Sequence, residues 1–295
     1  MSTPAARLWL QLTPFLFVVL WSTGFIGAKL GLPYAEPFTF LALRMGIAGG
    51  LLGVFAWLTR APWPRSWVQL AHLASAGLLV HALHLGGVFS AISLGLPAGI
   101  TALIMGLQPL LTAVVVGRVL GEQVTTRQWL GLILGQLGMV LVLENRFHSG
   151  LISLAGLLSV GLGLLALTAG TLYQKRFCSQ MDLRSGGAIQ YAFSAVFLAL
   201  LASLTETMQV SWSGEFIFAL TWLVLVLSVG AVGLLYSMIR YGAAARIASL
   251  FYLSPPFAVL FAYLLFDELL GPTALAGMAI VAIGVALVNF PARRS

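Results

Sequence analysis

Polar side chains stand in the middle of long apolar runs at a few places in this 295-residue chain. His81 and His84 are three positions apart, so in a helix both imidazoles lie on one face. Gln108 and Ser254 each precede a proline in two other apolar runs. An unpaired polar group is costly in hydrocarbon, so such side chains typically bind one another or face a polar cavity. Together they predict recognition of a small molecule by hydrogen bonds.

Aromatic side chains extend this set. Trp21 offers a large flat face and an N–H donor, and Tyr252 lies two residues before Ser254. We expect Trp21 and Tyr252 to bind the same small molecule as the four polar residues, although Trp21 would equally suit a packed helix interface. Weaker candidates for this site are Ser22, Arg44, Thr168 and Tyr236. A threonine in such a helix usually bonds its own backbone.

Arg44 is the one basic residue that falls inside an apolar run. It follows Pro37 by seven residues, or roughly 10 Å at 1.5 Å per helical residue. Two roles are open for its guanidinium. It could pair with a carboxylate of the bound molecule, or it could bond backbone carbonyls and reach toward the bilayer surface. We expect the second, structural role.

The composition identifies the environment of these residues. The chain is 60% hydrophobic and 8% charged, whereas about a quarter of the residues of a soluble domain are charged. A helix crosses a bilayer core with about 20 residues, and the uncharged runs reach that length. We predict an all-α integral membrane protein with ten transmembrane helices, at residues 9–30, 37–58, 67–93, 97–118, 127–144, 151–175, 185–206, 215–240, 245–266 and 271–290.

Lysine and arginine predict the orientation, because cytoplasmic loops are enriched in them. With the N-terminus inside, twelve of the fifteen fall in cytoplasmic segments, two fall on the opposite side, and Arg44 lies within a helix. We therefore expect both termini to be cytoplasmic, in a bacterial inner (plasma) membrane.

The chain also repeats itself. Four residues recur 146 positions later, because Pro109, Glu122, Gly131 and Gly138 are matched by Pro255, Glu268, Gly277 and Gly284. This predicts two repeats, residues 1–146 and 147–295. Each holds five helices, and an odd number inverts the second repeat in the membrane. Inverted repeats around a central cavity are a common construction of secondary transporters.

Proline in mid-helix removes a hydrogen bond and bends the helix. We expect Pro109, Pro255 and Pro256 to form symmetric hinges beside Gln108 and Ser254. No Asp or Glu lies at the centre of a predicted helix, so a carboxylate proton relay lacks its usual parts. Any coupled proton would fall to His81 or His84, and transport without a coupled ion fits equally well.

The residues also resemble a known family. Trp21 to Lys29, Leu43-Arg44 and the duplicated Pro…Glu…Gly…Gly series are similar to the tandem EamA domains of the drug/metabolite transporter superfamily. This resemblance implies ten helices in two inverted repeats, and a cavity built by helices 1, 3, 4, 6, 8 and 9. The family includes bacterial exporters of amino acids, among them the YddG-type exporters. The second copy departs at Leu167 and Gln190, which replace the tryptophan and the arginine.

We therefore expect a secondary transporter, not an enzyme, that exports small metabolites by alternating access. Aromatic or neutral amino acids are the expected substrates. A multidrug transporter of cations is the alternative within transport, although it would need an intramembrane carboxylate. An intramembrane lipid-processing enzyme is the alternative from another class. No cofactor, metal or nucleic acid is expected; the partners are the substrate and the lipid bilayer, and either a monomer or a homodimer is possible.

Overall fold

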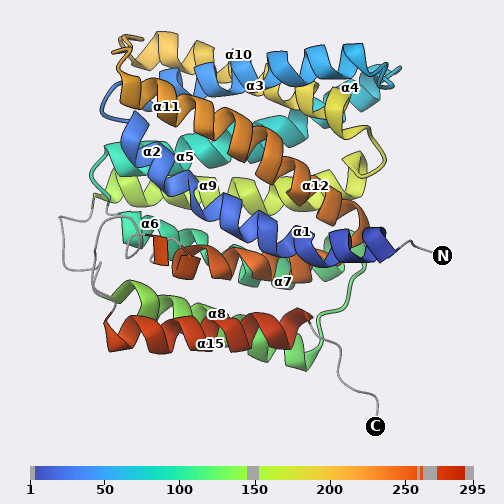
Figure 1. The fold of residues 1–295 in the computed structure, drawn as a ribbon, viewed down its shortest axis with the longest axis vertical. Helices are drawn as coiled ribbons and strands as arrows, with labels where there is room; N and C mark the ends of the chain where they lie inside the picture. Colours follow the sequence, from blue (N-terminus) through green and yellow to red (C-terminus); the bar gives the residue numbers. More distant parts are fainter. Residues whose placement is uncertain (1–3, 97, 145–152, 258–259, 262–270, 290–295) are drawn as a thin grey trace.

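The computed structural model describes residues 4–96, 98–144, 153–257, 260–261 and 271–289 (Figure 1). Its first part contains α1 (Pro4–Ser22), α2 (Gly24–Gly31), α3 (Pro37–Leu58), α4 (Trp67–Gly77), η1 (Leu78–Leu83), α5 (His84–Ser93), α6 (Ala98–Met105), α7 (Gln108–Leu120) and α8 (Thr126–Leu143). The second part contains α9 (Leu154–Tyr173), η3 (Gln174–Cys178), α10 (Leu183–Thr205), α11 (Gly214–Trp222), η4 (Leu223–Ala231), α12 (Val232–Tyr241), α13 (Ala244–Ser249), η5 (Leu250–Leu253) and α15 (Pro272–Asn289). Within the described ranges the regular elements are all helical, which confirms the predicted class.

Eight helical segments of the described chain are long and apolar enough to span a membrane. Several are composite: α4, η1 and α5 form one, and α11, η4 and α12 form another. The first predicted helix is divided at Thr23 into α1 and α2, and its apolar part, Leu12–Ser22, is shorter. The ninth predicted helix begins with α13 and η5, and its later part lies outside the described residues, as does the predicted repeat boundary at 146 and 147. The chain is thus a multi-pass membrane protein.

Local sequence explains where several helices begin and end. Ser66 accepts a hydrogen bond from the Gln69 backbone N–H at the start of α4, and Thr125 forms a capping box with Gln128 at the start of α8. Gly121 ends α7 with a φ of 69°, a conformation that glycine adopts without strain. These signals fix short connections between the long helices.

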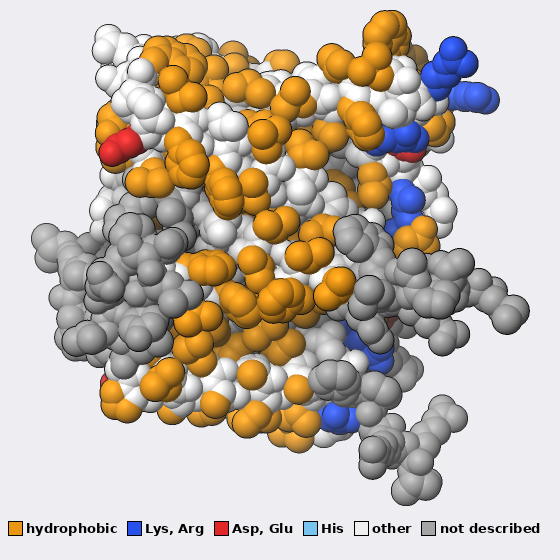
Figure 2. All heavy atoms as spheres, in the orientation of Figure 1, with side chains coloured by type: hydrophobic (Ala, Val, Ile, Leu, Met, Phe, Trp, Pro, Cys, Tyr) orange, Lys and Arg blue, Asp and Glu red, His pale blue; other side chains and the backbone are white. Residues whose placement is uncertain are grey.

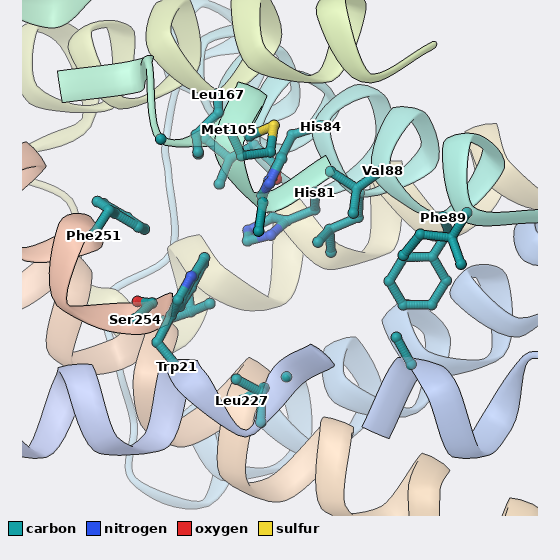
Figure 3. Close-up of a pocket in the computed structure, with 18 of the residues that line it drawn as sticks. Trp21, His81, His84, Val88, Phe89, Met105, Leu167, Leu227, Phe251 and Ser254 are labelled. Atoms are coloured by element: carbon teal, nitrogen blue, oxygen red, sulfur yellow. The ribbon is translucent and has the colours of Figure 1, made fainter. Parts of the chain in front are cut away.

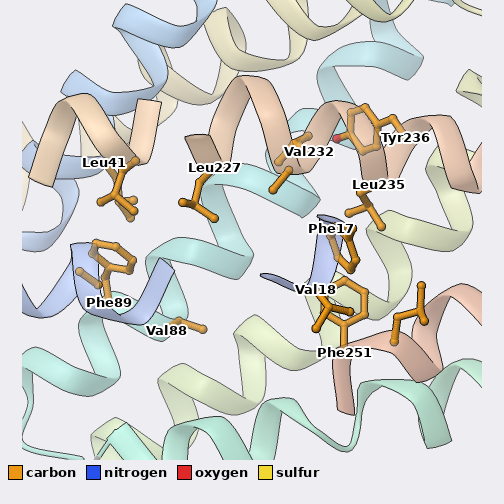
Figure 4. Close-up of a cluster of buried hydrophobic side chains, with 14 of the residues drawn as sticks. Phe17, Val18, Leu41, Val88, Phe89, Leu227, Val232, Leu235, Tyr236 and Phe251 are labelled. Carbon is orange, nitrogen blue, oxygen red and sulfur yellow. The ribbon is translucent and has the colours of Figure 1, made fainter. Parts of the chain in front are cut away.

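Helices α8 and α15 pack side by side at one edge of the molecule, and α3 packs on α10 at the opposite edge (Figure 1). Between these pairs, α5 packs on α9, and η4 contacts both α1 and α3. Buried apolar side chains fill the space between the layers. In Figure 4, Phe17 and Val18 of α1 lie beside Phe251 and Leu235 from the second half of the chain.

The connections gather at two ends of the helical bundle. α1 begins and α15 ends at the same end (Figure 1), and Lys and Arg side chains gather there on the face that Figure 2 shows. We call this the Arg-rich end. Apolar side chains cover the flanks of the described helices (Figure 2), as expected of surfaces that face lipid.

Carboxylates fasten both ends. At the end opposite the Arg-rich end, Glu206 accepts hydrogen bonds from the backbone N–H groups of Phe38 and Thr39, each at 2.7 Å, and so caps α3. Glu36 accepts from the backbone N–H of Thr207 at 2.7 Å and from its hydroxyl at 2.6 Å. These reciprocal bonds join the start of α3 to the end of α10.

At the Arg-rich end, Glu122 after α7 forms an ion pair with Lys175 in η3. Glu122 also accepts a hydrogen bond from the backbone N–H of Ala244 at 2.9 Å, and Lys175 donates to the carbonyl oxygen of Gly242 at 2.6 Å. The Glu122–Lys175 ion pair therefore joins the segment after α7, in the first half of the chain, to η3 in the second half. Both side chains also bind the backbone where α12 connects to α13.

Candidate functional site

A cavity lies among the helices and is lined from both halves of the chain (Figure 3). The volume of this cavity is about 100 Å³, which is room for several waters or a small organic group. Most of the lining is apolar. Its polar side chains are Trp21, Arg44, His81, His84 and Ser254.

Trp21 and Phe251 line one side of this cavity, and Phe17 packs against both of them. The rings of Trp21 and Phe251 meet edge to face with centroids 5.2 Å apart, and Phe17 lies 5.3 Å from each of them. Phe251 lines the cavity. It also lines a second, smaller pocket, which lies toward the Arg-rich end and is lined by Lys175 as well. The Phe251 side chain therefore separates the two spaces.

The two histidines face the cavity from the other side, and Figure 3 shows both imidazoles directed toward the space near Trp21 and Ser254. His84 Nδ1 lies 3.0 Å from the carbonyl oxygen of Val80. A carbonyl only accepts, so Nδ1 carries the proton and donates, which leaves Nε2 an acceptor in the neutral ring. The structure confirms that this i, i+3 pair shares one face.

His81 has a different partner. The Tyr236 hydroxyl donates to Gln190 Oε1 at 2.7 Å, so His81 Nε2, 3.0 Å from the same hydroxyl, is the donor of the second bond. We assign the His81 proton to Nε2 on this basis, and its Nδ1 is then an acceptor. Gln190 Nε2 continues the network to Gln174 Oε1 at 2.9 Å. A buried chain of side chains thus fixes the His81 ring.

Arg44 also lines the cavity and is 5% exposed. Its Nε donates to Ser228 Oγ at 3.0 Å, across 184 positions of sequence. Tyr191 donates to the carbonyl oxygen of the same Ser228 at 2.6 Å, and its ring lies 4.3 Å from that of His81. Arg44 and His81 therefore belong to one polar layer of the bundle.

Widened helical turns carry this layer. His81 lies in η1, Gln174 in η3 and Ser228 in η4, and all three segments are π-helical. A π-helical turn inserts an extra residue and changes which face the following side chains take, and such turns are frequent at functional sites. The polar residues thus meet at a place that regular α-helical periodicity does not predict.

Other predicted site residues lie elsewhere. Gln108 lines the smaller pocket, where its Nε2 donates to Thr112 Oγ1 at 3.1 Å and to Thr171 Oγ1 at 3.4 Å. Tyr252 is fully buried against Gly135 and does not line the main cavity. The hydroxyls of Ser22 and Thr168 donate to the carbonyl four residues earlier in their own helices.

The prolines differ in position. The fourth predicted helix is interrupted at Gly106 and Leu107, and Pro109 stands in the first turn of α7, where its missing N–H costs no hydrogen bond. Pro255 lines the cavity, and Pro255 and Pro256 lie two and three residues after Leu253, where the 3₁₀ segment η5 ends.

Sequence reasoning did not select Ser228, Gln174 and Phe251. Gln190 carried a signal, because it stands at the repeat equivalent of Arg44. Ser228 carried none, since a single serine in an apolar run is common. Among the described residues, no group of three or more His, Cys, Asp or Glu side chains lies close enough to hold a metal ion.

These features define a class of protein: a multi-pass helical membrane protein with a buried, mainly apolar cavity and a few oriented polar groups. The chain belongs to the EamA-like transporter family, which matches it twice in tandem, over residues 8–144 and 154–290. This confirms the resemblance to the drug/metabolite transporters.

Its relatives include the uncharacterized transporter YvbV of Bacillus subtilis, 30% identical over 92% of this chain and 88% of that protein. The uncharacterized inner membrane transporter YedA of Escherichia coli is 25% identical over 95% and 92% of the two chains. A probable amino-acid metabolite efflux pump of Escherichia coli is 23% identical over 94% of each. The protein in one crystal structure is 22% identical in sequence and has a similar fold, with a TM-score of 0.80. The match covers 94% of this chain and 95% of the chain in that structure.

Proposed function

We propose that this protein is a secondary transporter that exports small metabolites, most simply aromatic or neutral amino acids and related compounds, by alternating access. The observation that carries the proposal is the cavity, which is buried between the two halves and presents oriented hydrogen-bonding groups beside flat apolar surfaces. Trp21, His81, His84 and Ser254 would contact the substrate. The efflux-pump relative supports the substrate class.

Equivalent positions of the two repeats support an inverted-repeat mechanism. Three pairs that are 146 residues apart line the same cavity: Trp21 with Leu167, His81 with Leu227, and Met105 with Phe251. A cavity on a pseudo-two-fold axis would have this property. Rocking of one repeat against the other would then expose it to each side in turn.

The ends of the cavity suggest the state of the transporter. Its lining includes Gly24 and Ala28 of α2 and Ile92 near the end of α5, all away from the Arg-rich end. Toward the Arg-rich end, Phe251 and the Glu122–Lys175 ion pair close the path. We propose that the Arg-rich end is cytoplasmic in a bacterial inner membrane, so that this state is closed to the cytoplasm.

Closure and opening need flexible points. The break at Gly106–Leu107 before Pro109, and the 3₁₀ segment before Pro255 and Pro256, are repeat-equivalent places where the helices depart from α-helical geometry. We propose that they are the hinges. A cation pump is less well supported, because no carboxylate of the described residues lines the cavity.

Reconstitution tests this proposal. Purified protein in liposomes is expected to catalyse counterflow of at least one labelled aromatic or neutral amino acid, with and without an imposed pH gradient. Stimulation by the gradient, lost in H81Q or H84Q, would assign the proton to these rings. H72Q is the matched control, since His72 pairs with Tyr173 outside the cavity. Absence of counterflow for every amino acid, in protein that elutes as a folded species, would reject the substrate class.

A further inference from the structure

We infer that Arg44 is the carboxylate anchor of the transport site, so that the substrate must carry an anionic carboxylate beside an apolar body. This inference rests on the proposed function and names the chemistry that the same cavity selects. It replaces the structural role that the sequence favours for Arg44.

The first observation is the incomplete bonding of a buried cation. A guanidinium has five N–H donors and does not lose its charge in proteins. In the part of the chain that the structure describes, the bond from Nε to Ser228 Oγ is the one hydrogen bond of Arg44. Its other four N–H donors therefore lack a partner among these residues, although the side chain is 5% exposed and lines the cavity.

The second observation is the lack of a counter-ion. Within the described ranges the ion pairs are Lys175 with Glu122 and Arg184 with Asp182, and neither involves Arg44. Buried charges are normally paired, because taking an ion out of water costs several kcal/mol. A ligand that brings its own carboxylate would supply the missing partner, and the planar Nη edge accepts a carboxylate in a bidentate manner.

The third observation is the orientation of the guanidinium. The Oγ of Ser228 accepts the hydrogen bond from Arg44 Nε. Ser228 is itself held in place, because the Tyr191 hydroxyl donates to its carbonyl oxygen at 2.6 Å. The anchor is therefore positioned before a ligand arrives, which reduces the entropy lost on binding. Ser228 is a positioning residue in this scheme.

The remaining polar groups restrict the rest of the ligand. His81 and His84 offer acceptor nitrogens in their neutral forms, and Ser254 Oγ is buried without a partner in the described chain. An N–H or O–H beside the carboxylate can bond to them. A cation without a carboxylate would meet Arg44 with no anion to offset the repulsion, so amines should be rejected.

Four probes of equal apolar body separate these requirements: phenylalanine, 3-phenylpropanoate, phenethylamine and phenylalaninamide. We expect the first two to inhibit counterflow of labelled phenylalanine and to bind the detergent-solubilised protein, and the amine and the amide to bind at least tenfold more weakly. R44Q should weaken binding of both acids at least tenfold, and S228A should weaken it less. R184Q, which removes an arginine outside the cavity, should leave it unchanged.

The outcomes distinguish the two proposals. Transport that accepts the amine or the amide as well as the acids, or that is unchanged in R44Q, would overturn the anchor and leave the transporter intact. Silence of all four probes in folded wild-type protein would overturn both. If R44Q does not fold, R44K and the wild-type preference among the four probes decide, because R44K keeps the charge and loses the bidentate geometry.

Discussion

The backbones of Gly131 in α8 and Gly284 in α15 are in mutual contact: a methyl group on either glycine would lie 2.6 Å from the carbonyl oxygen of the other. Gly138 and Gly277 repeat this relation, at 2.8 Å and 2.7 Å. Because Gly277 and Gly284 are the repeat equivalents of Gly131 and Gly138, the repeat relation exchanges the two contacts. Small residues at such crossings let membrane helices pack closely.

Substitution of these glycines should therefore destabilise the pair of helices. We expect G131A and G277A each to lower stability by about 1–3 kcal/mol, because the added methyl overpacks the crossing. Their effects should be similar, since the two positions are repeat equivalents. G161A is the control, because its methyl would meet no atom within 4 Å. Thermal unfolding in detergent measures the stability of each variant. Equal melting temperatures of G131A, G277A and G161A would contradict the predicted overpacking.

Glu122 should hold the Arg-rich end closed. In a C178S background, a cysteine at Thr171, which lines the smaller pocket, should react slowly with a hydrophilic maleimide. E122Q removes the ion pair between Glu122 and Lys175. The two side chains are 23% and 20% exposed, and ion pairs this exposed contribute about 0–1 kcal/mol to the stability of the closed arrangement. The reaction should then be up to about fivefold faster.

D182N is the matched control for E122Q, because the Asp182–Arg184 pair lies at the same end but outside the pocket. An equal rate in E122Q and the parent would mean that the Glu122–Lys175 pair does not limit access.

Tyr236 should be the most sensitive member of the buried polar network. Y236F removes the hydroxyl that contacts Gln190 and His81, and it leaves two buried groups without a partner. The expected loss is about 1–3 kcal/mol, seen as a lower melting temperature. Y241F, at a position that is 80% exposed, should melt like the wild type. A melting temperature unchanged in Y236F would show that other groups or water replace these bonds.

Glu36 should make stability depend on pH. Hydrogen bonds from the side chain and backbone of Thr207 lower the pKa of this carboxyl below its ordinary value of 4.5. A lowered folded-state pKa contributes stability above pH 4.5, and that stability is lost as the pH falls through the folded-state value. Melting temperatures between pH 7 and pH 3 should therefore fall less in E36Q than in the wild type.

T207V provides the partner test for Glu36, because it removes the hydroxyl donor and keeps the backbone donor. Its pH dependence should lie between those of the wild type and E36Q. An E36Q curve that parallels the wild type throughout would assign the acid sensitivity to other groups.

The sequence by itself determined the helical membrane class and the tandem family match. Scarce charge and long apolar runs require helices that satisfy their own backbone in lipid, and the i, i+3 spacing of His81 and His84 predicts a shared face. The recurrence of Pro109, Glu122 and the glycines identified the tandem halves and the family. These features depend on local composition and spacing, which a linear chain displays directly.

Only the tertiary structure decided which polar groups share a cavity. Membrane helices are apolar on nearly every side, so periodicity does not tell which face of α3 carries Arg44 inward or that Tyr252 packs on Gly135. The π-helical turns at His81 and Ser228 also change the register of the following residues. The bond between Arg44 and Ser228 spans 184 positions, and it exists because α3 and η4 pack together.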